Sequence, residues 1–198
     1  MIKLITQSIR QKLVWIFICG VLYPLAMTAI AQLAFPWQAN GSLVERNGKL
    51  VGSALLAQQF TGDKYFWSRP SAASYGTGPS GIVGSGGSNY GPTSAQLQTN
   101  VRANVKAFRD ANKLAADAPV PADMVYASAS GLDPDISPEA ARLQIARVAA
   151  ARGMSPDQVT ALVDKHVQLP QWGFLGEARV NVLLLNLALD AAVPAKSP

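Results

Sequence analysis

The part of the chain best suited to hold a small ligand is a glycine-rich loop at residues 74–92, and within it the string Ser85-Gly86-Gly87-Ser88-Asn89. Backbone N–H groups that no side chain screens can converge on a phosphate. The string lacks the Gly-Lys-Ser/Thr ending of a P-loop, so no lysine is placed for the terminal phosphates and no hydroxyl for Mg²⁺. The motif alone favours a structural loop over a nucleotide site, and both interpretations stay open.

Side chains that could act as nucleophile, base or metal ligand are few. His166 is the only histidine, and a serine nucleophile needs a nearby base. With Cys19 as the only cysteine, the sequence has no zinc-binding pattern. Asp133 and Asp135 flank a proline and could hold a cation, although this spacing is more typical of a turn. We therefore predict no catalytic residue and no metal site.

An uninterrupted apolar run near the N-terminus is long enough to cross a membrane. Lys3, Arg10 and Lys12 precede the run, and no charged side chain interrupts it. A helix rises about 1.5 Å per residue and needs roughly 20 residues to span the hydrocarbon core. We therefore predict a transmembrane helix at 13–36, which Pro24 would kink unless a neighbouring group satisfies the carbonyl that it frees.

The distribution of charge predicts the orientation of this span. Three of the 17 Lys and Arg residues precede it, and none of the 12 Asp and Glu residues does. Because positive residues beside a span stay on the cytoplasmic side, residues 1–12 are predicted to be cytoplasmic and residues 37–198 to form an exported, periplasmic domain. The chain would then be a single-pass protein of the cell inner membrane. The remaining charge is scattered, which argues against a nucleic-acid partner.

A cleavable signal peptide is the alternative interpretation of the same segment. Ala29-Ile30-Ala31 has the small-x-small form that signal peptidase recognises. Cleavage there would release a soluble binding protein or hydrolase beginning near Gln32. Against this alternative, the apolar run continues through Phe35, and Trp37 stands where an interfacial aromatic residue would anchor a spanning helix. The anchor is favoured, and the lipid bilayer is the first predicted partner.

The remaining sequence predicts one domain of helices and short strands. Asn47-Gly48 predicts a type I′ turn and therefore a β-hairpin over 42–53. Ser137-Pro138 and Ser155-Pro156 each predict a helix start, with a serine cap and proline in the first turn. Periodicity and composition predict the other elements: a short helix at 53–60, a strand at 65–67, a helix at 95–115 capped by Thr93 and Gln96, a strand at 179–182 and an apolar helix at 183–189. This mixture favours an α+β fold.

Several strings of this sequence resemble the C subunit of the potassium-transporting Kdp P-type ATPase (the KdpC family). The resemblance covers essentially the whole chain, and its most specific strings are Arg69-Pro70-Ser71-Ala72 and the stretch from Ser128 to Asp133. The other matching pieces are Gln38–Leu43, Val51–Ser53, Tyr65–Trp67, Ser85–Asn89, Gln144, Arg147–Ala149, Ala151–Arg152, Gly176, Val180–Val182 and Leu185–Asn186.

The resemblance implies an accessory subunit of a high-affinity potassium import pump, without a catalytic site of its own. Its implied partners are a channel-like potassium subunit, an ATP-hydrolysing P-type subunit and a very small hydrophobic subunit. It also implies a catalytic chaperone that raises the ATP affinity of the hydrolysing subunit. Ser85–Asn89 would then contact ATP in a ternary complex, with no tightly bound cofactor. Position 84 is Gly84, where the family pattern has a Gln that could hydrogen-bond a ribose or base.

The predicted orientation limits how this loop could influence ATP. A loop on the exported side cannot touch cytosolic ATP across a hydrocarbon core about 30 Å thick. Either the orientation is reversed or the effect on nucleotide is indirect, and we favour the second. The exported domain would pack on the outer face of the potassium subunit and would affect ATP use only by biasing which pump conformation is populated.

Overall fold

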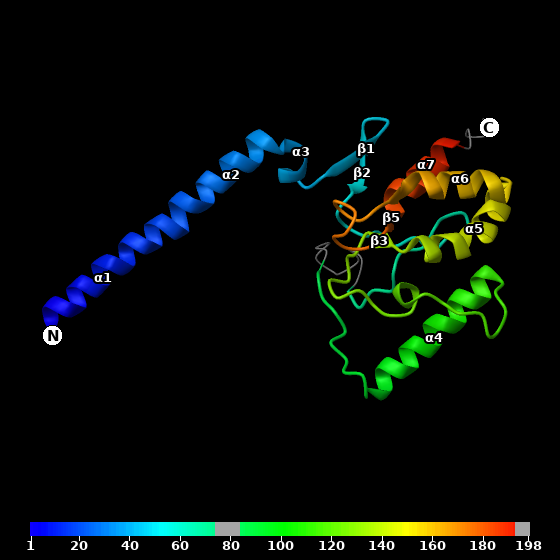
Figure 1. The fold of residues 1–198 in the computed structure, drawn as a ribbon, viewed down its shortest axis with the longest axis horizontal. Coiled ribbons are helices and arrows are strands. Elements are labelled where there is room, and N and C mark those ends of the chain that lie inside the picture. The colour runs from blue at the N-terminus through cyan, green and yellow to red at the C-terminus, as the bar shows by residue number, and fades with distance from the viewer. Residues whose placement is uncertain (74–83, 193–198) are drawn as a thin grey trace. The chain divides into compact units, whose positions relative to one another are not determined.

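The computed structural model describes residues 1–73 and 84–192 (Figure 1). The chain divides into two compact units, Met1–Ser53 and Ala54–Pro198, which are treated separately below. Of the predicted glycine-rich loop 74–92, residues 74–83 lie outside the described part. Residues 84–92 form an irregular segment that leads to a helix.

A long apolar helix dominates the first unit. It comprises α1 (Ile2–Phe17), a π-helical turn at Ile18–Leu22 and α2 (Tyr23–Ala34), and it is long and apolar enough to cross a membrane. The helix starts earlier than position 13 and ends before position 36. It ends at Ala34 because Phe35 precedes a proline, a position that disfavours helical dihedrals; its φ is −139°.

Pro24 lies inside this helix without interrupting it. Proline has no N–H and its ring clashes with the carbonyl four residues earlier. The π-helical turn stands directly before it, and the N–H of Tyr23 bonds the carbonyl of Ile18, five residues back. A wider turn at this point accommodates the proline, as π-bulges do elsewhere in helices. The helix therefore continues through Pro24 by widening one turn.

A short helix and a hairpin complete the first unit. Helix α3 (Pro36–Ala39) is followed by β1 (Leu43–Arg46) and β2 (Lys49–Ser53), which pair antiparallel. The predicted type I′ turn is confirmed, with φ values of 53° at Asn47 and 71° at Gly48. The indole N–H of Trp37 donates to the carbonyl of Leu43 at 2.9 Å, so α3 is fixed to the start of the hairpin.

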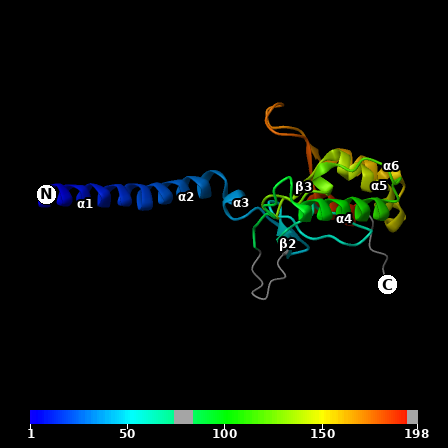
Figure 2. The ribbon, with the colours of Figure 1, turned by 90° about the horizontal axis from the view of Figure 1, so that it is seen from below.

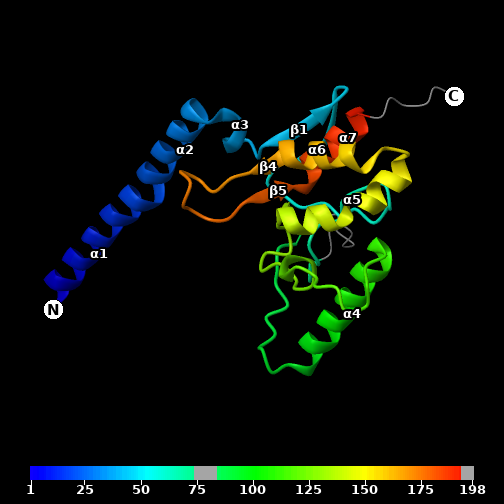
Figure 3. The same ribbon diagram turned by 45° about the vertical axis from the view of Figure 1, so that its right-hand side comes forward.

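Four helices and a small sheet make up the described part of the second unit. The helices are α4 (Ala95–Asn112), α5 (Pro138–Arg152), α6 (Pro156–His166) and α7 (Val182–Ala192). The sheet has the order β3-β5-β4, with β3 (Asp135–Ile136), β5 (Arg179–Asn181) and β4 (Val167–Gln168) all antiparallel (Figure 3). A single 3₁₀ turn lies at Ala122–Met124. The α+β prediction is confirmed.

The core of this unit lies where α5, α6 and α7 meet around β5. Figures 1 and 2 show α5 and α6 side by side, with α4 below them in the view of Figure 1. Most of the side chains that are completely shielded from solvent are small or branched apolar groups, which suits close helix packing: Ala140, Ala141, Val148, Val159, Val163, Val180, Leu185 and Leu189, together with Phe66. The polar side chain of Gln144 is equally shielded.

Local cap signals predicted the helix starts well. Ser137 and Ser155 accept hydrogen bonds from the N–H groups of Ala140 and Gln158, and α5 ends at Gly153 in the left-handed conformation. The predicted start of α4 at residue 95 is confirmed, but Ser94 rather than Thr93 caps the helix. That helix also ends sooner than predicted, where Lys113 takes the left-handed conformation.

Two predicted elements do not form. Residues 53–60 make turns instead of a helix, because tertiary bonds occupy their backbone: the carbonyl of Ala54 accepts from Asn181 at 2.8 Å, and the N–H of Ala57 donates to Leu132 at 3.0 Å. Residues 65–67 form no strand: Tyr65 lies in a bend, and Phe66 and Trp67 have no regular secondary structure. The predicted turn at 133–135 is replaced in part by β3, which begins at Asp135.

Candidate functional site

Three segments that are distant in sequence meet at one place in the second unit. They are Arg69–Ala73, Ser85–Asn89 and Ser128–Asp133, and we call their meeting point the junction. The N–H of Gly86 donates to the carbonyl of Ser130 at 2.8 Å, and the N–H of Ser128 donates to that of Pro70 at 3.1 Å. The hydroxyl of Ser71 donates to the carbonyl of Gly131 at 2.7 Å. The strings that carry the family resemblance therefore form one cluster.

Glycines allow these backbones to approach closely. A Cβ on Gly87 would lie 2.8 Å from the carbonyl oxygen of Ala129, a distance that side chains do not tolerate. Gly131 has a φ of 69°, and a Cβ there would lie 2.7 Å from the carbonyl oxygen of Gly86. By contrast, a Cβ on Gly86 would meet nothing within 4 Å. Gly87 and Gly131 are thus required by packing within the chain.

The same contacts bear on the predicted nucleotide contact. The Gly86 N–H and the Ser85 hydroxyl both donate to Ser130, the latter at 3.0 Å, so these two donors already have a partner inside the protein. Ser88 is half-buried and Asn89 is exposed, with a φ of 52°. Nucleotide binding by Ser85–Asn89 stays a prediction of the resemblance. Packing within the chain explains Gly87 without it, but it does not explain Gly86.

The two aspartates considered as cation ligands are each paired with an arginine. Asp133 lies 2.5 Å from a guanidinium nitrogen of Arg69, and its other oxygen accepts the N–H of Asp135 at 3.0 Å. Asp135 lies 3.2 Å from Arg179. Burial raises the pKa of Asp135, and Arg179 opposes that shift. Within residues 1–73 and 84–192, no group of three or more His, Cys, Asp or Glu residues could hold a metal ion.

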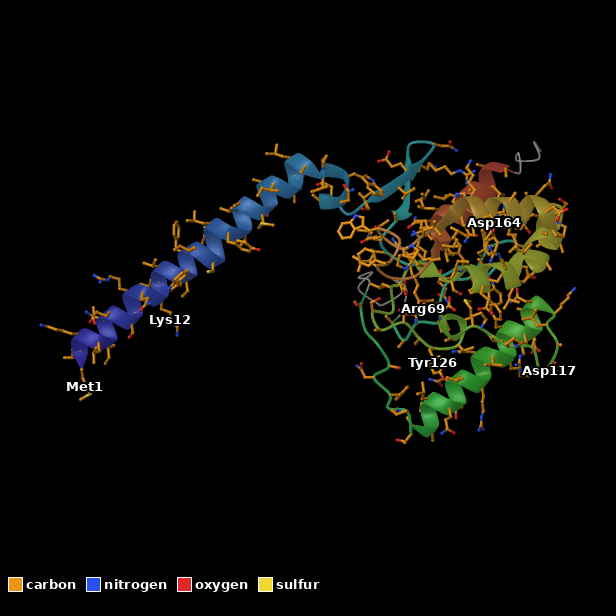
Figure 4. All side chains as sticks on the ribbon, in the orientation of Figure 1. Met1, Lys12, Arg69, Asp117, Tyr126 and Asp164 are labelled. Atoms are coloured by element: carbon orange, nitrogen blue, oxygen red, sulfur yellow. The ribbon has the colours of Figure 1, made fainter. Side chains whose placement is uncertain are left out.

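A hollow of about 500 Å³ opens beside the junction, between α4 and the irregular segment that precedes Ala73. Arg69, labelled in Figure 4, is at its edge and faces Asp133. The lining mixes aromatic and polar groups, chiefly Phe60, Trp67, Ser71, Asn104, Phe108 and Met124. It contains no carboxylate or histidine, so its chemistry is that of a packing or docking surface rather than of acid–base catalysis.

A set of buried polar side chains, which the sequence did not single out as a site, holds the segment Gly62–Trp67. Asn186 of α7 accepts from the Phe66 N–H at 2.8 Å and donates to the Phe66 carbonyl at 3.0 Å. Gln144 of α5 makes the same pair of bonds with Trp67, at 2.8 and 3.4 Å. We call this set, with Arg147, the side-chain clamp. It replaces the strand partner that residues 65–67 lack.

Arg147 of α5 completes the clamp. Its guanidinium donates to the carbonyls of Asp63 at 2.7 Å and Tyr65 at 3.0 Å, and to the Gln144 side chain at 2.8 Å. It also stacks 4.4 Å from the centre of the Trp67 ring. Burial lowers the pKa of Arg147 to about 10, so it stays charged at neutral pH. Such a fork of donors suits several carbonyls at once, which an ammonium would not.

His166 has no part in the junction or the clamp. It ends α6, is half-buried, and its Nδ1 lies 2.7 Å from the carbonyl of Leu162 in the preceding turn. The imidazole therefore packs against the end of its own helix.

Comparison with known proteins identifies sequences that match across both units. The family model described as "K+-transporting ATPase, c chain" matches residues 5–191. A protein of Geobacter sulfurreducens named potassium-transporting ATPase KdpC subunit is 50% identical over 194 residues, which cover 97% of this chain and all of the relative. Proteins with the same name from Rhodopseudomonas palustris strain TIE-1 and Variovorax paradoxus are 48% and 54% identical, over 98% and 89% of this chain and 100% and 90% of their own length.

Proposed function

The chain belongs to the KdpC family of K⁺-transporting ATPase c chains, and we propose that it is anchored by one helix in the cell inner membrane, where its exported domain stabilises an ATP-driven potassium import pump. The observation that carries this proposal is the extent of the match. It includes the apolar helix as well as the junction and the clamp, so the relatives share the whole arrangement and not one motif.

The proposed orientation places Met1 in the cytoplasm and the second unit in the periplasm. Lys3, Arg10 and Lys12 lie in the first turns of the helix, and cationic side chains beside a span remain on the cytoplasmic side. In this orientation the exported domain packs on the outer face of the channel-like potassium subunit. The helix packs among the membrane helices of the pump, and the ATP-hydrolysing and small hydrophobic subunits complete the complex.

The proposed effect on ATP is indirect. In this orientation the junction is separated from cytosolic ATP by a hydrocarbon core of about 30 Å. A domain that binds one pump conformation better than another shifts the population toward it, and the ATP affinity follows by linkage. The chaperone role implied by the resemblance would then arise from differential binding to the potassium subunit. Contact of Ser85–Asn89 with nucleotide is the competing account.

Cysteine labelling tests the orientation. In a Cys19→Ala background, Asp117→Cys would place a thiol at an exposed position after α4, labelled in Figure 4, and Lys3→Cys would place one at the start of α1. We expect an impermeant thiol reagent to label the first variant in intact spheroplasts and the second only after permeabilisation. The reverse pattern would overturn the orientation and make direct nucleotide contact the leading mechanism.

Growth at limiting potassium tests the pump assignment. In cells that depend on this pump, the full chain should restore growth, and a chain lacking residues 1–34 but exported by a cleavable signal should not. Normal growth with the truncated chain would contradict an assembly role for the helix. Mass spectrometry of the membrane-extracted chain tests the signal-peptide alternative directly, because an N-terminus near Gln32 would mean that the helix is removed.

Neighbouring glycines separate the direct from the indirect account of ATP affinity. Gly86→Ala adds a methyl group in open space, so it would hinder a bound nucleotide without disturbing the junction. We expect the purified pump with this variant to keep its KM for ATP, while a pump lacking the chain shows a raised KM. A raised KM with Gly86→Ala in a pump that assembles normally would favour direct contact.

A further inference from the structure

The connection between β4 and β5 exposes large apolar side chains to solvent. Most of this connection, Leu169–Gly176, is called the apolar loop here; it contains no charged residue, and Glu177 follows it directly. Leu169, Trp172 and Phe174 are 74%, 84% and 72% exposed, and Leu175 is 43% exposed. No other large apolar residue in the described part of the second unit is more than 58% exposed. The loop projects from the body of this unit in Figure 2.

Four N–H groups of the apolar loop donate to carbonyls within the loop itself. Gln171 and Leu175 exchange two bonds, both of 3.0 Å, and the N–H groups of Gly173 and Phe174 donate to Pro170 at 3.0 Å and Gln171 at 3.3 Å. A segment whose N–H and C=O groups are paired internally can leave water at a lower cost than an open loop can. The apolar loop thus combines an ordered backbone with outward-facing apolar side chains.

The tip of the loop has a backbone conformation that is unusual for its residue type. Trp172 has a φ of 54° and is followed by Gly173 at 83°. A bulky residue in the left-handed region costs energy, and such strain is concentrated at functional positions. Trp172 makes no compensating contact with the core, since most of its surface is exposed. The strained tip presents the indole of Trp172 to solvent.

We infer that the apolar loop inserts into the interfacial region of the lipid bilayer, as a second membrane contact beside the helix. Tryptophan, phenylalanine and leucine on a neutral surface are the side chains that bind this region. The alternative occupant is another protein. Four side chains on one ribbon offer a few hundred Å², well below the roughly 800 Å² per partner of a stable protein interface.

The covalent connection to the membrane helix favours the bilayer as the occupant. The chain runs from Phe35 to Leu43 over nine residues, which span at most about 30 Å, and part of this length is coiled in α3. Leu43 pairs with Ser53, directly before the second unit begins at Ala54. The second unit is therefore tethered to the membrane helix by a short covalent connection, and such tethering strengthens a weak contact with the bilayer by raising the effective concentration.

This inference rests on the proposed membrane anchor. A measurement of lipid depth on the full chain tests the insertion of the apolar loop and the membrane anchor separately. The full chain with Cys19→Ala and Phe174→Cys would be labelled with an environment-sensitive fluorophore and placed in nanodiscs of zwitterionic and anionic phospholipid. Asn100→Cys on α4, also exposed, is the matched control. Lipids carrying a spin label just below the headgroup would serve as quenchers.

We expect a blue-shifted emission and about twofold or greater quenching at position 174 relative to position 100, as for interfacial aromatic segments. Leu169→Cys should show the same result, and adding Trp172→Ser should reduce the quenching. A label at position 174 that behaves like the control would overturn the inference, whether the loop stays in water or waits for a protein partner. Failure of the chain to enter nanodiscs at all would instead contradict the anchor.

Discussion

The segment Gly62–Trp67 and the apolar loop are both irregular stretches that carry a tryptophan, yet they are held in opposite ways. The first has its backbone bonded by buried side chains of α5 and α7, and Phe66 lies in the core. The second bonds its own backbone and turns Trp172 outward. The difference shows that irregular backbone in this domain serves either as scaffold or as contact surface, according to which groups satisfy it.

The largest effect should come from breaking the side-chain clamp. Asn186→Ala leaves the buried N–H and carbonyl of Phe66 without partners, and unsatisfied buried groups cost about 1–3 kcal/mol each. We expect the free energy of unfolding of the second unit to fall by roughly 2–4 kcal/mol. Urea titration of the full chain in detergent, followed by circular dichroism, measures this. Asn100→Ala on the exposed face of α4, which removes only an exposed bond from Gln96, is the control and should change stability by less than about 0.5 kcal/mol. Equal stability of the two variants would contradict the clamp.

A smaller loss is expected at the junction, whose segments are held by close backbone packing instead of side chains. Gly87→Ala introduces a methyl group 2.8 Å from the Ala129 carbonyl, and overpacking of this kind costs about 1–3 kcal/mol. Gly86→Ala, one residue earlier, adds the same group in open space and should be tolerated. The pair can be compared by the same urea titration. If both variants were equally stable, the close contact at Gly87 would not be a constraint.

Whether an element could be predicted from the sequence depends on how far apart its interacting residues lie along the chain. The hairpin turn at Asn47-Gly48 and the caps at Ser137 and Ser155 were predicted because each depends on groups within about four residues. The strand at 65–67 was predicted wrongly because its hydrogen-bond partners are Asn186 and Gln144, about 120 and 77 residues away. No local pattern indicates that such a segment will bond to side chains.

The candidate site was also predicted only in part. The family strings named the three segments of the junction, but sequence alone did not indicate that Gly87 and Gly131 are glycines because two backbones touch there. The sequence did not predict that the apolar loop is exposed, because tryptophan and phenylalanine, as at Trp172 and Phe174, are residue types that are usually largely buried. Only the structure shows that they face outward.

Asp135 lies where the apolar loop joins the sheet, since its partner Arg179 begins β5. Burial raises its pKa in the folded state, so the folded protein binds a proton more readily than the unfolded chain does. Stability from this group therefore falls as the pH rises above about 4. Asp135→Asn should flatten the dependence of stability on pH between about 4 and 7, with a net change at neutral pH within about 1 kcal/mol because the Arg179 pair is lost too. A pH profile of unfolding that is identical to that of the unchanged chain would show that the carboxylate is not desolvated.

The smallest effect, and the one with the opposite sign, should come from Trp172. A residue held at a φ of 54° is strained unless it is glycine or asparagine. Trp172→Asn relieves that strain and removes no buried contact, so we expect the second unit to become more stable by about 0.5–1 kcal/mol. The same change should weaken the lipid quenching of a label at position 174. A gain in stability together with a loss of membrane contact would mean that the strain at the tip is retained for what the loop binds. A loss of stability would place Trp172 among the groups that hold the fold, and the contrast with Gly62–Trp67 would disappear.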